Sequence, residues 1–331
     1  MDSDSEVVNA AAAIAAVLLH LQEQFAVAQG HIASKNLAAS EGILREIIFA
    51  LSPSDSDECT KIREKCVIAL GNLYVSHGQI VKLQQLLEEI RPLFNSLPKA
   101  KTAKIVRTLI DLMANVPGSE QLQVQVCRDS IQWCTVEKRA FLRQRVQSKL
   151  ASLLLKTKDY TNCNALLSEL LSEVLVFLAY SRFFRDAFCQ VRKLDDKPLL
   201  VEIHLVESRL YYDLRNFPRS RAALTAARTA AGAIYCPPAL QAAIDMQAGI
   251  INSQEKDFRT GFSYFVEAFD AFQNFDTPNA VLALKYMLLC KIMSSAAEEV
   301  GSLIDGKSPW RCGCVMSHVL SRQERHQVCR A

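Results

Sequence analysis

The stretch LRNFPRSRAALTAARTAAGAIYCPPALQAAIDMQAGIINSQEKDF, residues 214–258, holds one complete helical repeat between two similar turns. It opens on LRNF and closes on EKDF, and the last residue of each tetrapeptide is large and apolar, Phe217 or Phe258. These two residues are separated by about 40 residues, and two helical patterns fill the interval. A small residue, Ser220 or Gly261, follows three positions after each Phe. This pattern predicts a hairpin whose two helices cross closely.

The same turn recurs towards the N-terminus as SKNL, HGQI and TKDY, which end in Leu37, Ile80 and Tyr160. Ile80 follows Leu37 by one such interval, and Tyr160 follows Ile80 by two, with a weaker hairpin signal at Pro117–Glu120 in between. A repeat of two helices with this period is typical of an α-solenoid. We therefore predict an all-α fold, a right-handed α-solenoid of stacked helix hairpins that is TPR-like with a period of about 40 residues.

One interval breaks the period. Phe217 follows Tyr160 by much more than one repeat, and the excess equals the length of LVFLAYSRFFRDAFCQV, residues 175–191. We interpret this segment as an insertion that could extend the helix ending near Val174. An exposed patch that favours aggregation is the preferred reading, and a new partner groove is the alternative. Its aromatic residues would share one helical face: Phe177, Phe184 and Phe188.

Composition narrows the class of protein. The net charge of +3 is too small to indicate a nucleic-acid partner by itself. Eleven cysteines show no disulfide spacing, and most lie inside helical patterns, where a free Cys behaves as a small apolar residue. No apolar run approaches the roughly 20 residues that span a bilayer. The acidic start MDSDSEVV argues against a secretion signal, so we expect a reduced chain in the cytoplasm and nucleus.

Catalytic and metal motifs are sparse. We find no Gly-rich phosphate loop, HExxH, nucleophile elbow or dinucleotide fingerprint, so we predict no enzyme, no cofactor, and no catalytic or metal residue. Asp195–Asp196 are expected to cap a helix at its boundary. A zinc site in the tail is disfavoured because its C-x-C spacing is tighter than usual. The residues considered for it are Cys312, Cys314, His318, His326 and Cys329.

A basic stretch runs from Lys99 to Lys149 and carries ten Lys and Arg residues against four acidic ones. The functional hypothesis is that it docks on an acidic protein surface, and the alternative is a solvated helix face. Nucleic acid is disfavoured because aromatic residues for base stacking are not interleaved with the charges.

Five collinear stretches resemble a known family. They are PKAKTAKIVRTLID, EKRAFLRQRVQSKLASLL, KLDDKPLLVEI, AIYCPPALQAAIDMQAGI and LKYMLLCKIM. Together they resemble the PCI-domain lid subunits of the 26S proteasome regulatory particle. The resemblance runs from about residue 30 to about residue 307, without the insertion.

The resemblance implies a non-catalytic scaffold. In this family an N-terminal helical solenoid leads into a winged-helix PCI module and a terminal helix. The solenoid braces the lid against the core particle and the ATPase ring during degradation of ubiquitinated proteins. The implied partners are lid subunits, the core-particle α-ring and ATPase subunits, with no nucleic acid, membrane or small-molecule substrate.

We predict three regions: an N-terminal helix at residues 1–30, the solenoid at 31–306 and a divergent, disordered tail at 307–331. The family's PCI module is not recognisable after Gly306. Our hypothesis is that the insertion and the tail are translated intron or a faulty gene model. A chain without the PCI module is expected to lose stable incorporation into the lid. Two alternatives stay open, a free-standing helical-repeat adaptor and a PCI subunit of the signalosome.

Overall fold

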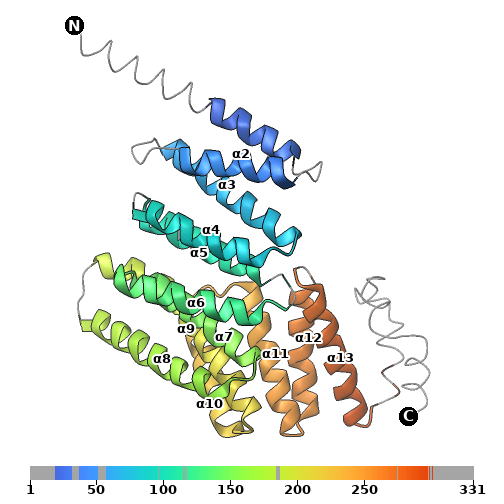
Figure 1. Cartoon of the computed structure of the whole chain (residues 1–331). Coiled ribbons are helices and arrows are strands. Elements are labelled where there is room, and N and C mark those ends of the chain that lie inside the picture. The colour runs from blue at the N-terminus through green and yellow to red at the C-terminus, as the bar shows by residue number, and fades with distance from the viewer. Residues whose placement is uncertain are drawn as a thin grey trace, which may run out of the picture. The chain divides into compact units, whose positions relative to one another are not determined.

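The computed structural model describes residues 19–31, 37–50, 57–95, 97–114, 118–183, 187–273 and 275–296, with Val116, Glu298 and Val300. Every regular element among these residues is a helix (Figure 1). The chain forms two compact units, unit 1 at residues 1–146 and unit 2 at residues 147–331. The predicted all-α class is confirmed.

Unit 1 is a succession of helices in which neighbours along the chain lie side by side (Figure 1). Helix α3 packs on α2, α4 and α5, so contacts join helices that are next or next but one in sequence. This is the packing pattern of a helical repeat. A helix over residues 19–31 comes first. Then follow α2 (Leu37–Ala50), α3 (Asp57–Ser76), α4 (Ile80–Ile90), the 3-10 helix η1 (Arg91–Asn95), α5 (Lys99–Met113), α6 (Glu120–Val136) and α7 (Ala140–Lys156), which continues into unit 2.

A buried tyrosine ties the first helices of unit 1 together. Tyr74 of α3 is fully buried, and its hydroxyl donates to Glu41 Oε1 of α2 at 2.8 Å. Lys82 Nζ of α4 donates to the other oxygen of Glu41 at 3.1 Å. Arg45 of α2 reaches Glu89 of α4 at 3.4 Å. The buried hydroxyl therefore has a charged acceptor, as the interior requires.

Unit 2 continues the same pattern. Helix α9 packs on α8, α10 and α11, while α12 packs on α11 and α13. One apolar cluster lies among α9, α10 and α11, and a second, rich in phenylalanine, lies among α11, α12 and α13. The helices are α8 (Tyr160–Phe183), α9 (Ala187–Asp213), α10 (Phe217–Gly232), α11 (Pro238–Gln254), α12 (Phe258–Phe272) and α13 (Thr277–Met293).

A residue in the left-handed backbone region marks the recurring turn. Gly78, Gly118, Lys158, Arg215 and Lys256 all have φ between 59° and 78°. These five residues precede α4, α6, α8, α10 and α12 and are about 40 residues apart, except that the interval from Lys158 to Arg215 is longer. Lys138, between α6 and α7, is a further left-handed residue outside this series. The turn geometry thus repeats with the period read from the sequence, and the long interval is the one that holds the insertion.

In the turns of unit 2, the residue after the left-handed position caps the next helix, whereas Gln79 and Ser119 in unit 1 make no side-chain cap. Asn216 Oδ1 accepts from the Arg219 backbone N–H, and Asp257 Oδ1 accepts from that of Thr260. Such caps satisfy a backbone donor that the helix itself leaves free. At α13 the capping residue is Asp276, whose Oδ1 accepts from the Asn279 backbone N–H, and Thr277 is the first residue of the helix.

Small residues three positions after the large apolar residue of a turn, as predicted for Ser220 and Gly261, recur at Ser40 and Cys163, while the turn at Ile80 has Leu83 there. Ser40, Cys163 and Ser220 are completely buried, and Gly261 is buried as well. Ser220 exchanges hydrogen bonds with Ser208 across the α9–α10 hairpin, its Oγ donating to the Ser208 carbonyl at 2.7 Å. The predicted close crossing is therefore confirmed.

Five free cysteines are buried, so the expectation that they act as small apolar residues is confirmed. Burial raises the pKa of the Cys66 thiol to about 12, and those of Cys134 and Cys163 to about 11. A thiol in this state is largely protonated at neutral pH and reacts slowly. The five lie on α3, α6, α8 and α13: Cys66, Cys127, Cys134, Cys163 and Cys290.

The segment that we predict to be an insertion, residues 175–191, lies largely within two long helices. Helix α8 runs on to Phe183 and α9 already begins at Ala187, so the predicted extension beyond Val174 is confirmed. The expectation that Asp195–Asp196 lie at a helix boundary is wrong, because the early start of α9 places them in its interior. The side chains of Phe177, Phe184 and Phe188 lie outside the described residues.

The predicted region boundaries at residues 30 and 306 stay predictions. The tail residues considered for zinc also lie outside the described part of the chain. Within the described ranges, no group of three or more His, Cys, Asp or Glu could hold a metal ion. The same ranges contain no helix long and apolar enough to cross a bilayer.

Candidate functional site

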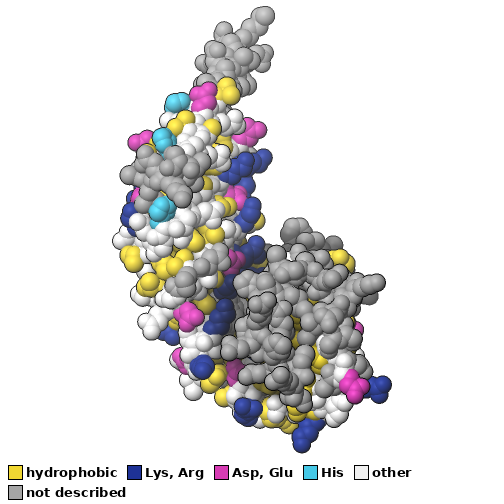
Figure 2. Space-filling view, turned by 90° about the vertical axis from the view of Figure 1, so that its right-hand side faces the viewer, with side chains coloured by type: hydrophobic (Ala, Val, Ile, Leu, Met, Phe, Trp, Pro, Cys, Tyr) yellow, Lys and Arg dark blue, Asp and Glu magenta, His cyan; other side chains and the backbone are white. Residues whose placement is uncertain are grey.

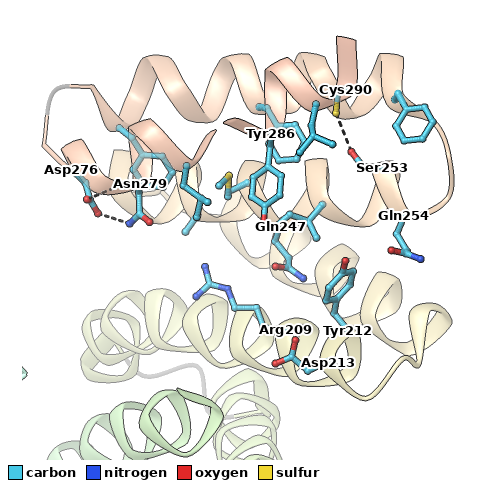
Figure 3. Close-up of a pocket in the computed structure, with 18 of the residues that line it drawn as sticks. Arg209, Tyr212, Asp213, Gln247, Ser253, Gln254, Asp276, Asn279, Tyr286 and Cys290 are labelled. Carbon is cyan, nitrogen blue, oxygen red and sulfur yellow. Dashed lines mark hydrogen bonds between the residues drawn. The ribbon is translucent and has the colours of Figure 1, made fainter. Parts of the chain in front are cut away.

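A groove of about 870 Å³ opens in unit 2 between α9 on one side and α11, α12 and α13 on the other (Figure 3). We call it the unit-2 groove. Leu155 of α7 completes its wall. Its size is that of pockets that bind ligands or peptide side chains.

A glycine shapes one wall of the unit-2 groove. A Cβ on Gly249 of α11 would lie 2.6–2.8 Å from the ring of Phe265, which is too close for any other residue without a shift. The glycine lets Phe265 of α12 pack directly under α11, and the same ring stacks on Tyr286 of α13 at 5.1 Å. Ser253 of α11 also contacts the Cys290 sulfur at 3.3 Å. These contacts hold the three helices that line the groove together.

Large apolar side chains on α13 are exposed along the unit-2 groove. Leu282, Leu289 and Met293 are 41%, 54% and 55% exposed, and all three line it. Their spacing of seven and four positions places them on one face of the helix. Phe275, before α13, is 48% exposed and also lines the groove. An apolar stripe of this kind is typical of a protein-interaction surface.

Two polar side chains in the unit-2 groove have no partner among the described residues. Gln247 of α11 is only 3% exposed, and its side-chain nitrogen makes no hydrogen bond. Arg209 of α9 is partly buried, forms no hydrogen bond or ion pair within the described part of the chain, and has its pKa lowered by burial. The Arg209 guanidinium, the Gln247 amide and the Tyr286 hydroxyl extend into the same space (Figure 3).

The other charged residues that line the unit-2 groove are two carboxylates, Asp213 and Asp276, and three cations lie in the hollow beside it. Asp213 lies four positions after Arg209 on α9, but no ion pair joins the two in the described structure. Asp276 is engaged as the cap of α13. A second hollow of about 260 Å³ shares Leu155, Tyr212 and Asp213 with the groove. It adds three cationic side chains: Lys156, Lys158 and Arg215.

The arrangement suits binding. An arginine and an amide donor without partners, set among apolar walls, can receive an anionic group. Burial raises the pKa of the Cys290 thiol, which makes it a poor nucleophile at neutral pH.

The basic stretch from Lys99 to Lys149 falls on α5, α6 and α7, and several of its charges are occupied within unit 1. Lys101 Nζ donates to Thr60 Oγ1 at 2.7 Å, and Lys104 pairs with Glu64 at 2.6 Å. Arg139 donates to the Phe94 carbonyl at 3.1 Å. Figure 2 shows Lys and Arg side chains interleaved with Asp and Glu on the face turned to the viewer. Docking of this stretch on an acidic surface stays a prediction.

Sequence reasoning missed Arg209 and Gln247. A signal was present in α11, because Asp245 and Gln247 interrupt the apolar run AAIDMQAGII and are both buried. Arg209 gives a weaker signal, three positions after the core residue Val206. The sequence could not show that the two side chains, which lie on helices separated by a whole hairpin turn and α10, share one groove.

Comparisons with known proteins agree with the proteasomal resemblance found in the sequence. Residues 21–157 match the family described as the 26S proteasome regulatory subunit RPN6 N-terminal domain. The 26S proteasome non-ATPase regulatory subunit 11 homolog of Arabidopsis thaliana is 48% identical over 256 residues, 77% of this chain and 57% of that protein. The Dictyostelium discoideum subunit 11 is 45% identical over 246 residues, 74% of this chain and 55% of that protein. The probable regulatory subunit rpn6 of Schizosaccharomyces pombe is 39% identical over 282 residues, 85% and 63% of the two chains.

A solved structure supports the fold alone. The crystal structure of BtubC (BKLC) from P. vanneervenii superposes with a TM-score of 0.51 at 14% identity, and covers 78% of this chain and 95% of that one. Its helical-repeat architecture agrees with the hairpins described above.

Fold and groove together define the chain as a helical-repeat protein of the α-solenoid class. By its relatives, it resembles 26S proteasome regulatory subunit 11, also named RPN6, over most of its own length, and residues 21–157 match the N-terminal domain of that subunit. The predicted resemblance is thereby confirmed. The chain spans about 55–63% of the length of these relatives.

Proposed function

We propose that this chain is a non-catalytic scaffold subunit in the lid of the 26S proteasome regulatory particle. It braces the lid against the core-particle α-ring and the ATPase ring during ubiquitin-dependent protein degradation. The observation that carries the proposal is the 48% identity to a proteasomal subunit over 256 residues, which reaches beyond the N-terminal domain match at residues 21–157. Its partners would be proteasome subunits, in the cytoplasm and nucleus.

The absence of catalysis is part of the proposal. The names of the relatives describe non-ATPase regulatory subunits. The chemistry of the unit-2 groove agrees, since it offers donors and apolar walls for binding. A helical repeat also presents a broad surface for protein contacts.

Affinity purification tests the proposal. The chain is tagged in its own cells, and co-purifying proteins are identified by mass spectrometry. We expect core-particle and ATPase subunits to be recovered, with core peptidase activity in the eluate, and lid subunits in less than stoichiometric amounts. The control is Leu70→Asp, which places a charge at a fully buried position of unit 1 and should lose these partners by unfolding. Recovery of chaperones alone, or of a reproducible set without proteasome subunits, would contradict the proposal.

A further inference from the structure

Three features of the unit-2 groove have no role within the fold. Gln247 is buried with a side-chain nitrogen that lacks a partner, which destabilises the free chain. Arg209 holds a positive charge that no described residue neutralises. Helix α13 exposes large apolar residues to the same space. A ligand that supplies an anion and apolar groups would resolve all three.

We propose that the unit-2 groove is a docking site for an acidic, apolar peptide segment of a partner protein. A carboxylate of that segment binds Arg209 and Gln247, and its apolar side chains contact Leu282, Leu289 and Met293.

The donor set favours a carboxylate. The planar guanidinium of Arg209 can bind both oxygens of a carboxylate, and the Gln247 amide adds a further donor. Tyr286 extends its hydroxyl into the same space (Figure 3). The cations of the adjoining hollow would attract an acidic segment and repel a basic one. Two carboxylates also line the groove: Asp213 sits beside these cations, and Asp276 is engaged as the cap of α13.

The shape favours an extended peptide. The polar and apolar features come from α9, α11 and α13, which are successive repeats of one array. Packed helices are about 10 Å apart, so a ligand that touches all three must reach about 20 Å. An extended chain rises about 3.3 Å per residue, so six to eight residues would cover this distance.

The chain's own C-terminal sequence does not match this chemistry. Residues 307–331 carry five Lys and Arg residues and a single Glu. A segment this basic offers few carboxylates to Arg209 and Gln247, and the three cations of the adjoining hollow would repel it. The occupant is therefore sought in another protein.

This inference goes beyond the scaffold proposal and is tested separately from it, because the purified chain alone is used. Failure of the chain to join the proteasome would leave it untouched. Failure of peptide binding would likewise leave the scaffold proposal untouched.

The experiment is a selection of phage-displayed random octapeptides on the purified chain. We expect enriched sequences to contain Asp or Glu flanked by aromatic or aliphatic residues. One enriched peptide is then synthesised with a fluorescein label, and its affinity is measured by fluorescence anisotropy. Its Glu→Gln or Asp→Asn analogue should bind at least tenfold more weakly.

Variants of the chain locate the binding. Arg209→Gln should weaken peptide binding at least tenfold, while Arg259→Gln, the same change at an exposed position outside the groove, should leave it unchanged. Gln247→Leu should weaken binding at least threefold and should not lower the melting temperature of the free chain. The melt separates loss of a binding group from loss of the fold.

Three results would overturn the inference. They are no enrichment over selection on bare beads, enrichment of neutral or basic peptides, and full affinity in a folded Arg209→Gln chain. Self-association that is lost in Arg209→Gln, measured by analytical ultracentrifugation, would assign the groove to a second copy of this chain instead.

Discussion

At the scale of single residues, Gly249 sets how closely α11 approaches α12. An added methyl group would meet the Phe265 ring at 2.6–2.8 Å. We predict that Gly249→Ala destabilises the chain by about 1–3 kcal/mol, because overpacking outweighs the gain in helix propensity. Gly42→Ala is the control, since nothing lies within 4 Å of a Cβ at that position in α2. It should stabilise by up to about 1 kcal/mol. Urea melts of both variants measure the difference, and equal effects would contradict the packing argument.

Asp245 predicts a pH dependence. The residue is buried on α11, burial raises the pKa of its carboxyl, and its principal partner is the Gln241 amide at 3.0 Å. The folded chain thus holds this proton more tightly than the unfolded chain. The contribution of Asp245 to stability is therefore greatest below the unfolded pKa of about 3.9, and it declines as pH rises towards the folded pKa.

Replacing this carboxyl with an amide should remove the free-energy cost of holding an ionised carboxylate in the interior at neutral pH. We expect Asp245→Asn to raise the melting temperature at pH 7 by about 2–4 °C, with a difference that narrows towards pH 4. Asp270→Asn, at an exposed position on α12, is the matched control and should change little. Melts between pH 4 and pH 7 make the measurement. A pH-independent gain would show that the effect does not come from the Asp245 carboxyl.

At the scale of elements, the turn between two helices is the repeated device. Lys256 has φ +68°, a conformation that strains any residue with a Cβ. Lys256→Gly should therefore stabilise the chain by up to about 1 kcal/mol, which we would measure by thermal melting. The same change at Lys285, exposed in the interior of α13, should destabilise it by about 1 kcal/mol. The two variants should change the melting temperature in opposite directions. If both lower it, Lys256 is not strained in the folded chain.

The turns were also what the sequence predicted best. Tyr160, Phe217 and Phe258 each begin a helix, because a short-range signal of left-handed residue, cap and large apolar residue fixes each start. Prediction from short stretches of sequence failed where the structure of a residue depends on segments farther along the chain. Asp195–Asp196 lie within α9 because the inserted segment continues the helix. The groove was not predicted, since Arg209 and Gln247 meet only through the packing of α9 and α11.

At the scale of the whole molecule, the insertion is the departure from regular repeats. The left-handed residues that precede α4, α6, α8, α10 and α12 are about 40 residues apart, but the interval that contains residues 175–191 is longer by the length of that segment. Val174 is 2% exposed, whereas Leu175 and Val176 are 50% and 61% exposed. Val174 is thus the last buried side chain among those described in α8. A solenoid is stabilised by contacts between neighbouring repeats, and ordered residues without such contacts cost conformational entropy.

Deleting residues 175–191 should restore a regular array. We expect a rise of at least about 3 °C in melting temperature and less aggregate in size-exclusion chromatography. Deleting residues 218–234, a segment of equal length from α10 and its neighbouring turn, is the control and should prevent folding. A deletion chain that melts below the original would mean that the insertion stabilises the fold.

The buried cysteines give the chain a built-in set of probes for local opening. They lie on four helices along the array, and a protonated, enclosed thiol cannot be alkylated until its surroundings part. The order in which Cys66, Cys127, Cys134, Cys163 and Cys290 take up a label, read by peptide mass, would reveal which part of the array separates first. No foreign dye or engineered site would be needed. The five buried thiols therefore report, without any change to the chain, the order in which its helices separate during unfolding.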